Sequence, residues 1–325
     1  MAHVNITTLG AEVQAPPITE DLQRFFNRLD DIPLMQALTG SSRRGPKGYH
    51  VYTLWRCFLV KHYLSLPSTE AMRRTLHNNP FIARACGISS PEDIPHHSTF
   101  SRFFKLLADV RYLHLVKDVS RRLVRHHYQT LPAFGERVAM DSTTLKGWSN
   151  GGKNPKFDKQ AGWSVKKGSQ GVKEATYGYK LHLLVDCESE LPISANVSAG
   201  NVNDAKRASN LLSEARFTTG YFHPRYVMAD KGYSGKPLYR LIRWQYHAQP
   251  IIDPNPGHKK LVAEVAEMKK TTGWQALYKQ RPAVERAYSR LKGQRSLNHI
   301  TVRGLRKVTV HCYLSLIAMQ ASTRH

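Results

Sequence analysis

The chain has 325 residues, 41% of them hydrophobic, which is enough to build one large domain or two ordinary ones with sizeable cores. It carries 48 Lys and Arg against 24 Asp and Glu, a formal net charge of +24. Such an excess favours nucleic acid as the partner, whereas ribosomal tails are usually poorer in apolar residues and membrane-surface binders need a basic amphipathic stripe.

The N-terminal residues contain no basic region followed by an apolar run, and no apolar stretch approaches the roughly 18 residues that span a bilayer. The cysteines show no metal-ligand or redox spacing and lie at Cys57, Cys86, Cys187 and Cys312. We therefore expect a cytoplasmic protein with reduced core thiols and no contact with a membrane.

Residues 1–131 are expected to form an all-helical DNA-binding domain. Apolar residues recur there at spacings of three and four in several segments, as in Leu22, Phe25, Phe26 and Leu29. The last segments, 68–87 and 94–110, are compatible with a helix-turn-helix. The exposed side of the final helix would then bring Ser101, Arg102 and Lys105 to a major groove of DNA. An ordinary helical bundle with a solvated polar face explains the pattern equally well.

Residues 132–325 alternate strand and helix patterns. Asp141 follows three apolar residues and precedes turn-forming residues, so we expect it at the end of a strand. A loop of about 35 residues is expected from there to Tyr177, since no clear pattern interrupts it. An antiparallel hairpin over 177–199 follows.

Downstream of the hairpin, the helix and strand patterns fall at 204–216, 226–229, 236–246 and 247–253. Asp230 directly follows the second of these, a short strand. Open α/β sheets bind ligands at the carboxyl ends of their strands, so Asp141 and Asp230 are candidate catalytic residues. Taken singly, each is explained about as well as a turn-forming Asp.

The segment from Tyr278 to Lys292 combines charges with helical spacing. Arg281, Glu285 and Lys292 stand at offsets of four and seven, which puts them on one side of a helix. An ordinary surface face, with the two cations paired to Glu285 or Glu264, has the same pattern.

Together these segments resemble the DDE transposases of the IS4 and IS5 insertion-sequence type. The matching pieces are VAMDSTTLKG around Asp141, VMADKGYSG around Asp230, RPAVERAYSRLKG around Glu285, and the intervening YGYKLHLLVD. The gaps of two, three and six residues between Tyr278, Arg281, Glu285 and Lys292 match the signature of these transposases, and PHHSTFSRF is similar to their N-terminal domain. The resemblance covers roughly residues 137–320. It implies an α/β fold, a ribonuclease H-like mixed sheet flanked by helices, preceded by an all-α N-terminal domain.

The resemblance also implies a two-metal site. Asp141 would bridge two Mg²⁺ ions, with Mn²⁺ able to substitute, while Asp230 and Glu285 would each hold one of them. Carboxylate oxygens suit such hard cations, and a pair of ions about 4 Å apart activates the attacking oxygen and stabilises the leaving one. In relatives the Tyr, Arg and Lys of the signature contact DNA phosphates, which assigns that role here to Tyr278, Arg281 and Lys292. Lys231, next to Asp230, is a further candidate for a backbone contact.

The expected function is transposition of DNA. The protein would bind the terminal inverted repeats, hydrolyse the ends and join the freed 3′ hydroxyls to target DNA, as a homodimer because an element has two ends. A metal-dependent nuclease of the same fold would share the acids but leave no joined product. A non-catalytic DNA-binding protein descended from a transposase would keep the charge and the helices.

Tryptophans are candidates for base stacking, since some relatives flip a base onto Trp during cleavage. Trp274 is the first candidate and Trp148 and Trp163 come next, although core packing is the commoner role for each. Trp244 is expected in the core. Only about 28 residues separate Asp253 from Gln280, too few for the large β insertion that some relatives carry between the same elements.

Overall fold

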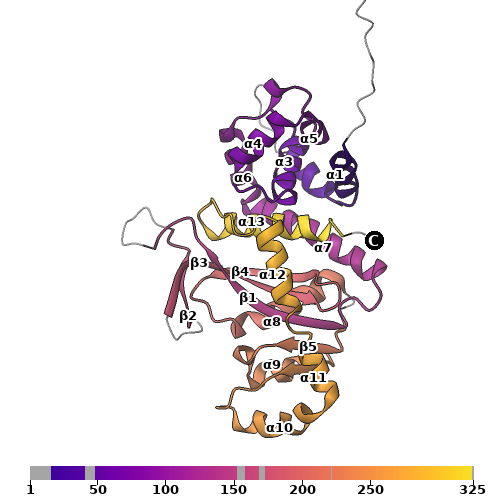
Figure 1. Ribbon diagram of the computed structural model, residues 1–325, viewed down its shortest axis with the longest axis vertical. Helices are drawn as coiled ribbons and strands as arrows, with labels where there is room; N and C mark the ends of the chain where they lie inside the picture. Colours follow the sequence, from indigo (N-terminus) through magenta and orange to yellow (C-terminus); the bar gives the residue numbers. More distant parts are fainter. Residues whose placement is uncertain (1–15, 41–47, 152–157, 168–172, 221, 324–325) are drawn as a thin grey trace, which may run out of the picture.

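The computed structural model describes residues 16–40, 48–151, 158–167, 173–220 and 222–323 (Figure 1). The N-terminal part is helical. Its helices are α1 (Pro17–Asn27), α2 (Ile32–Gly40), α3 (Val51–Tyr63), α4 (Thr69–Asn78), α5 (Pro80–Ala85), α6 (His97–Leu107) and α7 (Val110–Thr130), with a single 3₁₀ turn, η1 (Pro91–Asp93).

Helix α6 shows how the apolar spacing builds this part. Its buried residues are Phe100, Phe103, Phe104 and Leu107. Phe58 of α3 packs against two of these rings edge-on, with centroids 5.7 and 5.2 Å apart. Arg102 and Lys105 lie on the opposite, exposed face of α6. The exposure predicted for this face is confirmed, and its DNA contact stays a prediction.

The second part of the chain is a mixed sheet with helices. Its elements are β1 (Arg137–Lys146), β2 (Gly162–Lys167), β3 (Lys173–Asp186), β4 (Pro192–Ala199), α8 (Ala205–Thr219), β5 (Tyr226–Ala229), η2 (Lys231–Tyr233), α9 (Lys236–Arg240), η3 (Leu241–Gln245), β6 (Gln249–Ile252), α10 (Lys259–Lys270), α11 (Thr272–Tyr278), α12 (Ala283–Gln294) and α13 (Leu305–Gln320).

The sheet order is β2-β3-β1-β5-β6, and β4 also pairs with β3. Strand β1 is antiparallel to β3 and parallel to β5, which is parallel to β6. Helix α12 crosses the sheet over β1 and β3, while α8 packs against β3 and β4 (Figure 1). The mixed α/β sheet flanked by helices, behind an all-helical N-terminal region, confirms the predicted ribonuclease H-like class.

Two expectations about β1 and its following loop are wrong. Asp141 lies inside β1, not at its end, because the strand continues to Lys146 and pairs with β3 over its whole second half. The expected 35-residue loop contains β2, which is antiparallel to the first part of β3. Gly178 of β3 lets the end of β1 lie close to it, since a Cβ at this position would collide with backbone atoms of Leu145 and Gly147. These pairings are long-range, so the local pattern gave no sign of them.

Helix α13 lies between the N-terminal helices and the sheet (Figure 1). It is buried almost throughout and packs on α3, α6, α7 and β4. Its side chains form hydrogen bonds with both parts: Ser315 Oγ lies 3.0 Å from Nδ1 of His62 in α3, and the hydroxyl of Tyr313 donates to the carbonyl of Ala195 in β4 at 3.1 Å. The buried apolar residues accordingly form one continuous core. The predicted domain boundary at residue 131, between α7 and β1, stays a prediction.

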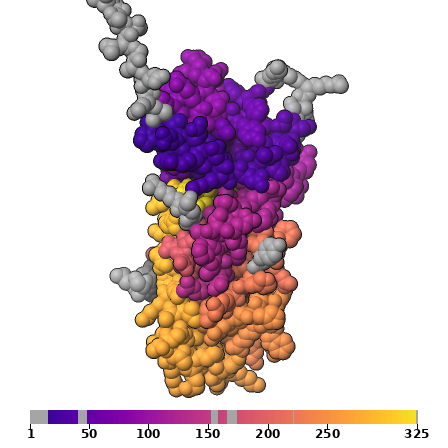
Figure 2. Space-filling model, turned by 90° about the vertical axis from the view of Figure 1, so that its right-hand side faces the viewer, coloured from indigo at the N-terminus to yellow at the C-terminus, as the bar shows by residue number. Residues whose placement is uncertain are grey.

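Seen from the side, the molecule is elongated, with the helices before residue 110 at one end and the segment around α10 at the other (Figure 2). The four cysteines are buried free thiols, as predicted. Among the helices of the described residues, none has both the length and the apolar character required to cross a membrane.

Candidate active site

Asp141 and Asp230 are neighbours at the centre of the sheet. Strands β1 and β5 run parallel with Ala139 opposite Met228, so two further residues along each strand lead to Asp141 and Asp230. Burial raises the pKa of Asp141 to about 6, and the charge of Asp230 contributes to this rise. Two carboxylates of the predicted three are thus close enough to interact.

The backbone after β5 fixes Asp230. Its Oδ1 accepts a hydrogen bond from the backbone N–H of Gly232 at 2.8 Å, which caps the short turn η2. Lys231 stands beside it with an exposed side chain. The carboxylate is therefore held at the strand end, as predicted, and one of its oxygens is already engaged by the backbone.

Glu285 lies in the first turn of α12 and its side chain is 52% exposed. It pairs with Arg281, one turn earlier, with 2.9 Å between guanidinium and carboxylate. The same arginine opposes the rise in the pKa of Asp141, so its positive charge acts on both acids. The alternative reading of Arg281 as the ion-pair partner of Glu285 is confirmed, whereas Glu264 pairs with Arg243.

Two further residues of α12 attach the helix to β1. The hydroxyl of Tyr288 lies 2.8 Å from the carbonyl oxygen of Asp141 and 2.9 Å from that of Leu181 in β3. The ammonium of Lys292 donates to the hydroxyl of Thr143 at 2.7 Å. Because Glu285, Tyr288 and Lys292 lie at offsets of three and four, one side of α12 faces the strand that carries Asp141. The predicted placement of Glu285 and Lys292 on one side of a helix is confirmed, whereas Arg281, predicted on the same helix, lies before it because α12 begins at Ala283.

Tyr278 belongs to the other side of the same site. It stacks on the buried Trp274 with centroids 4.9 Å apart, and burial raises its pKa, with Arg281 opposing and Asp253 and Asp230 adding to the rise. Tyr278 therefore lies close enough to Asp230 and Arg281 for their charges to act on its hydroxyl, and its contact with DNA stays a prediction.

The other tryptophans differ from Trp274. Trp148 and Trp163 are half exposed, and Trp244 is 78% exposed. The expectation that Trp244 is a core residue is wrong. It lies in η3, a π-helical segment whose wider turn buries Ile242 and leaves Trp244 facing solvent.

A divalent cation needs several oxygen ligands that converge on one point. Within the described ranges, no three Asp, Glu, His or Cys side chains converge closely enough to hold a metal ion. Asp141 and Asp230 offer carboxylate oxygens of the hard type that Mg²⁺ takes. The pKa of Asp141 is raised mainly by burial and further by the charge of Asp230, and a bound cation would oppose both effects. Glu285 is directed to Arg281 instead. The residues fit a metal site in which this one side chain changes its partner.

The remaining predicted contacts lie elsewhere. Arg102 and Lys105 are on α6, separated from the two aspartates by α13 (Figure 1). Arg102 donates to Thr99 on its own helix at 3.4 Å. The structure thus does not bring these two residues together with the acids.

Sequence reasoning missed a fourth acid near the centre. Asp204, which precedes α8, forms an ion pair with Lys180 at 2.9 Å and contributes to the raised pKa of Asp141. The ring of His182 lies 3.8 Å from it and is buried, which lowers the pKa of the histidine to about 4. An Asp at the start of a helix was the only local signal, and it is equally typical of a cap.

Comparisons with known proteins agree with this geometry. Residues 132–320 match a family model described as the transposase DDE domain, and residues 14–106 match a model described as a transposase domain (DUF772). A search of curated proteins and a search of solved structures found no match. The first model covers more than half of the chain and contains all three acids, and we conclude that the protein belongs to the DDE transposase family.

Proposed function

We propose that the protein binds the terminal inverted repeats of an insertion sequence, hydrolyses the DNA at the ends and joins each freed 3′ hydroxyl to target DNA. One observation carries the proposal. Asp141 within β1 and Asp230 directly after β5 lie side by side, because the two strands are parallel, and the helix that bears Glu285 is attached directly to the strand of Asp141. The IS4 and IS5 type is compatible with the family match.

Asp141, Asp230 and Glu285 are the residues that would hold divalent cations. Bound Mg²⁺ would supply charge neutralisation and activation of the attacking oxygen. For Glu285 to take part, its carboxylate must leave Arg281, and a DNA phosphate is a suitable replacement partner for that guanidinium. We infer that DNA binding and completion of the acid triad are coupled through Arg281.

The reaction needs no external energy source. In the first step a water oxygen attacks the phosphorus at the element end, and the bond to the 3′ oxygen breaks, leaving a 3′ hydroxyl and a 5′ phosphate. In the second step that hydroxyl attacks a phosphorus of the target and displaces the target's own 3′ oxygen. The first step hydrolyses one phosphodiester, and the second exchanges a phosphodiester of the target for a new one. Both steps are attacks of an oxygen on phosphorus that displace a 3′ oxygen, so the same acids can serve both.

Lys292 and Tyr278 flank this centre and would position the backbone of the end DNA. Lys292 is held beside the strand of Asp141 by its hydrogen bond to Thr143, and Tyr278 lies close to Asp230. Lys231, with its exposed ammonium, extends the same surface. Since an element has two ends, a homodimer assembled on DNA would present one such site to each.

The test is a joining assay. Labelled DNA that carries the sequences flanking the gene is incubated with a target plasmid and Mg²⁺, using the wild type, Asp230→Asn and Glu285→Gln. Glu267→Gln is the matched control, because its side chain is 82% exposed on α10. We expect joined product from the wild type and the control, and a loss of about 100-fold or more in the other two.

Two other outcomes of the joining assay would contradict the proposal. Cutting without joining by the wild type would replace the transposase by a nuclease of the same fold. Tight DNA binding with no metal-dependent product from any variant would identify a DNA-binding relative that has lost catalysis.

A further inference from the structure

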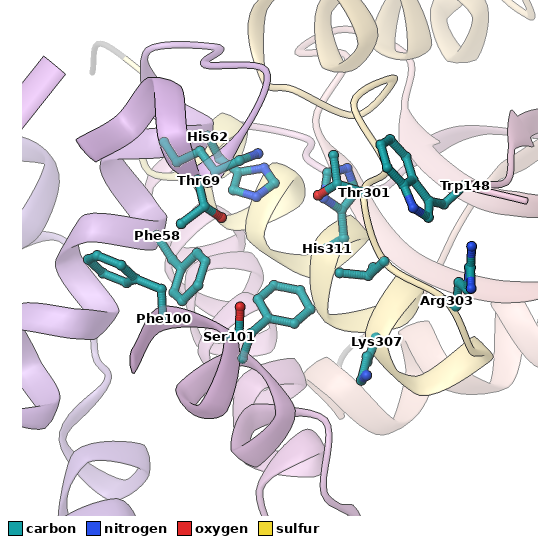
Figure 3. A pocket seen from close by; sticks show the side chains of 13 residues that line it. Phe58, His62, Thr69, Phe100, Ser101, Trp148, Thr301, Arg303, Lys307 and His311 are labelled. Atoms are coloured by element: carbon teal, nitrogen blue, oxygen red, sulfur yellow. The ribbon is translucent and has the colours of Figure 1, made fainter. Parts of the chain in front are cut away.

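A cavity of about 460 Å³ lies where the N-terminal helices meet the catalytic part (Figure 3). One side is formed by α3, α4 and α6, including the rings of Phe58 and Phe100. The other side is formed by Trp148, which follows β1, by Arg303 in the segment before α13, and by Lys307 in the first turn of α13. Its volume falls in the range of small-molecule sites.

Lys61 of α3 lines this cavity in an unusual state. Its side chain is 4% exposed, and within the described part of the chain its ammonium has no hydrogen-bond partner. Burial lowers its pKa to about 8, so it is mostly protonated at neutral pH. A buried ammonium without an acceptor is unfavourable, and an anion is the ligand that would relieve this cost.

The other charged residues that line the cavity are also positive. Arg303 and Lys307 add two cations, and the described lining contains no Asp or Glu. His62 and His311 lie beside Lys61, and burial together with the lysine charge lowers the pKa of both well below its usual value. Both rings are therefore neutral at neutral pH, and the described lining residues carry a net positive charge.

We propose that this cavity is a phosphate-binding site, with Lys61 as its buried ligand and Arg303 and Lys307 at its mouth. Three donors of this kind, Lys at the base and Arg and Lys on one segment, suit the oxygens of a phosphate group. The rings of Phe58 and Phe100 line the same cavity and lower the local dielectric around Lys61, which strengthens the attraction.

The phosphate source that the surroundings favour is DNA. A second hollow beside the cavity shares Arg303 and Lys307 with it and adds Lys105 of α6 and Arg306 of α13. Its one described carboxylate, Asp109, is paired with Arg111 at 3.0 Å, so the four cations leave the hollow with a net positive charge. The basic residues therefore continue from the cavity to the exposed face of α6, as a polyanion would require. The identification of the source as DNA rests on the proposed function, whereas the phosphate site does not.

The first experiment measures inorganic phosphate binding without metal or DNA, by calorimetry on the full chain at constant ionic strength. The variants are Lys61→Met, which keeps the size of the side chain, and Lys260→Met, an exposed lysine of α10, as the control. Wild type and Lys260→Met should bind one phosphate in the millimolar range or tighter, and Lys61→Met should bind about tenfold or more weakly. If Lys61→Met does not fold, Lys307→Met takes its place with the same expected direction.

Equal phosphate affinity in Lys61→Met and the wild type would overturn the proposal, and so would the absence of binding to the wild type. The second experiment separates the sources by adding end DNA to the phosphate-loaded protein. Displacement of phosphate by DNA in the wild type assigns the site to the DNA backbone. Phosphate binding that DNA leaves unchanged assigns it to a free phosphate compound. A protein that binds phosphate but fails to join DNA would refute the proposed function and leave the site intact.

Discussion

Burial decides how the individual charged residues behave. Asp141 is partly buried and next to Asp230, so its pKa rises to about 6, whereas Glu285 is half exposed and satisfied by Arg281. The sequence could identify these residues because each belongs to a short local pattern. It could not say which partner Arg281 would take, since an arginine four residues before Glu285 can either pair with that carboxylate or bind a DNA phosphate.

Lys61 allows a test of burial by pH. Its pKa is about 8 in the folded protein and near its usual 10.5 in the unfolded chain, so the unfolded state binds the extra proton more readily between these values. Below pH 8 the buried charge therefore costs about 3 kcal/mol of stability, and the cost disappears as the pH rises to 10.5. The wild type should gain that much relative to Lys61→Met over this interval.

The measurement is denaturant unfolding of both proteins in phosphate-free buffer from pH 7.5 to 10.5. The histidines beside Lys61 titrate below this interval and do not disturb the comparison. A difference between the two proteins that stays constant with pH would show that the ammonium is not buried as described.

Helix α12 carries Glu285 and is attached to the strand that carries Asp141. The sequence predicted that Glu285 and Lys292 share one side of a helix, because helical spacing is a local property, but it also placed on that helix Arg281, which lies before Ala283. What the helix docks on could not be predicted, because the contacts run from Tyr288 and Lys292 to β1, about 150 residues earlier. Contacts between distant segments also explain why the end of β1 and the whole of β2 were not predicted, because both depend on pairing with β3. Strand β5 was predicted at its exact bounds, because it is a short apolar run that can be recognised locally.

Tyr288→Phe tests the docking of α12. The substitution removes the hydroxyl that bridges to the carbonyls of Asp141 and Leu181 and should lower the free energy of unfolding by about 1 kcal/mol. The joining rate should fall clearly at temperatures where the variant is fully folded, because Glu285 loses its fixed distance from Asp141. Tyr49→Phe, at an exposed position, should change neither quantity. Joining by Tyr288→Phe at the wild-type rate would argue against this role of the helix.

At the scale of the whole molecule, α13 packs against both the N-terminal helices and the sheet, two parts that were predicted as separate domains. The composition and the apolar patterns predicted a helical part and an α/β part, and the overall class was correct. The central position of α13 was not predicted, since the sequence of a helix that is apolar on all sides does not indicate which elements pack against it. The cavity around Lys61 was missed for the same reason, because its lining is drawn from residues 58 to 311.

Leu314→Ala tests this continuity. Leu314 is fully buried in α13, and its truncation should cost about 2–5 kcal/mol. Because α13 packs on α3, α6 and β4, hydrogen exchange should show the N-terminal helices and the sheet losing protection together. Arg306→Ala, at an exposed position of the same helix, is the control. Loss of protection confined to one part would indicate two independently folding domains.

The most direct test of the account is strand joining by variants of Asp230 in two metals. Asp230→Cys replaces a hard oxygen ligand by a soft sulfur, which Mn²⁺ tolerates better than Mg²⁺. We predict that the wild type joins end DNA to target in either metal, that Asp230→Ala joins in neither, and that Asp230→Cys is inactive in Mg²⁺ and regains joining in Mn²⁺. Joining by Asp230→Ala at the wild-type rate in Mg²⁺ would contradict the assignment of this carboxylate as a metal ligand, and with it the proposed active site.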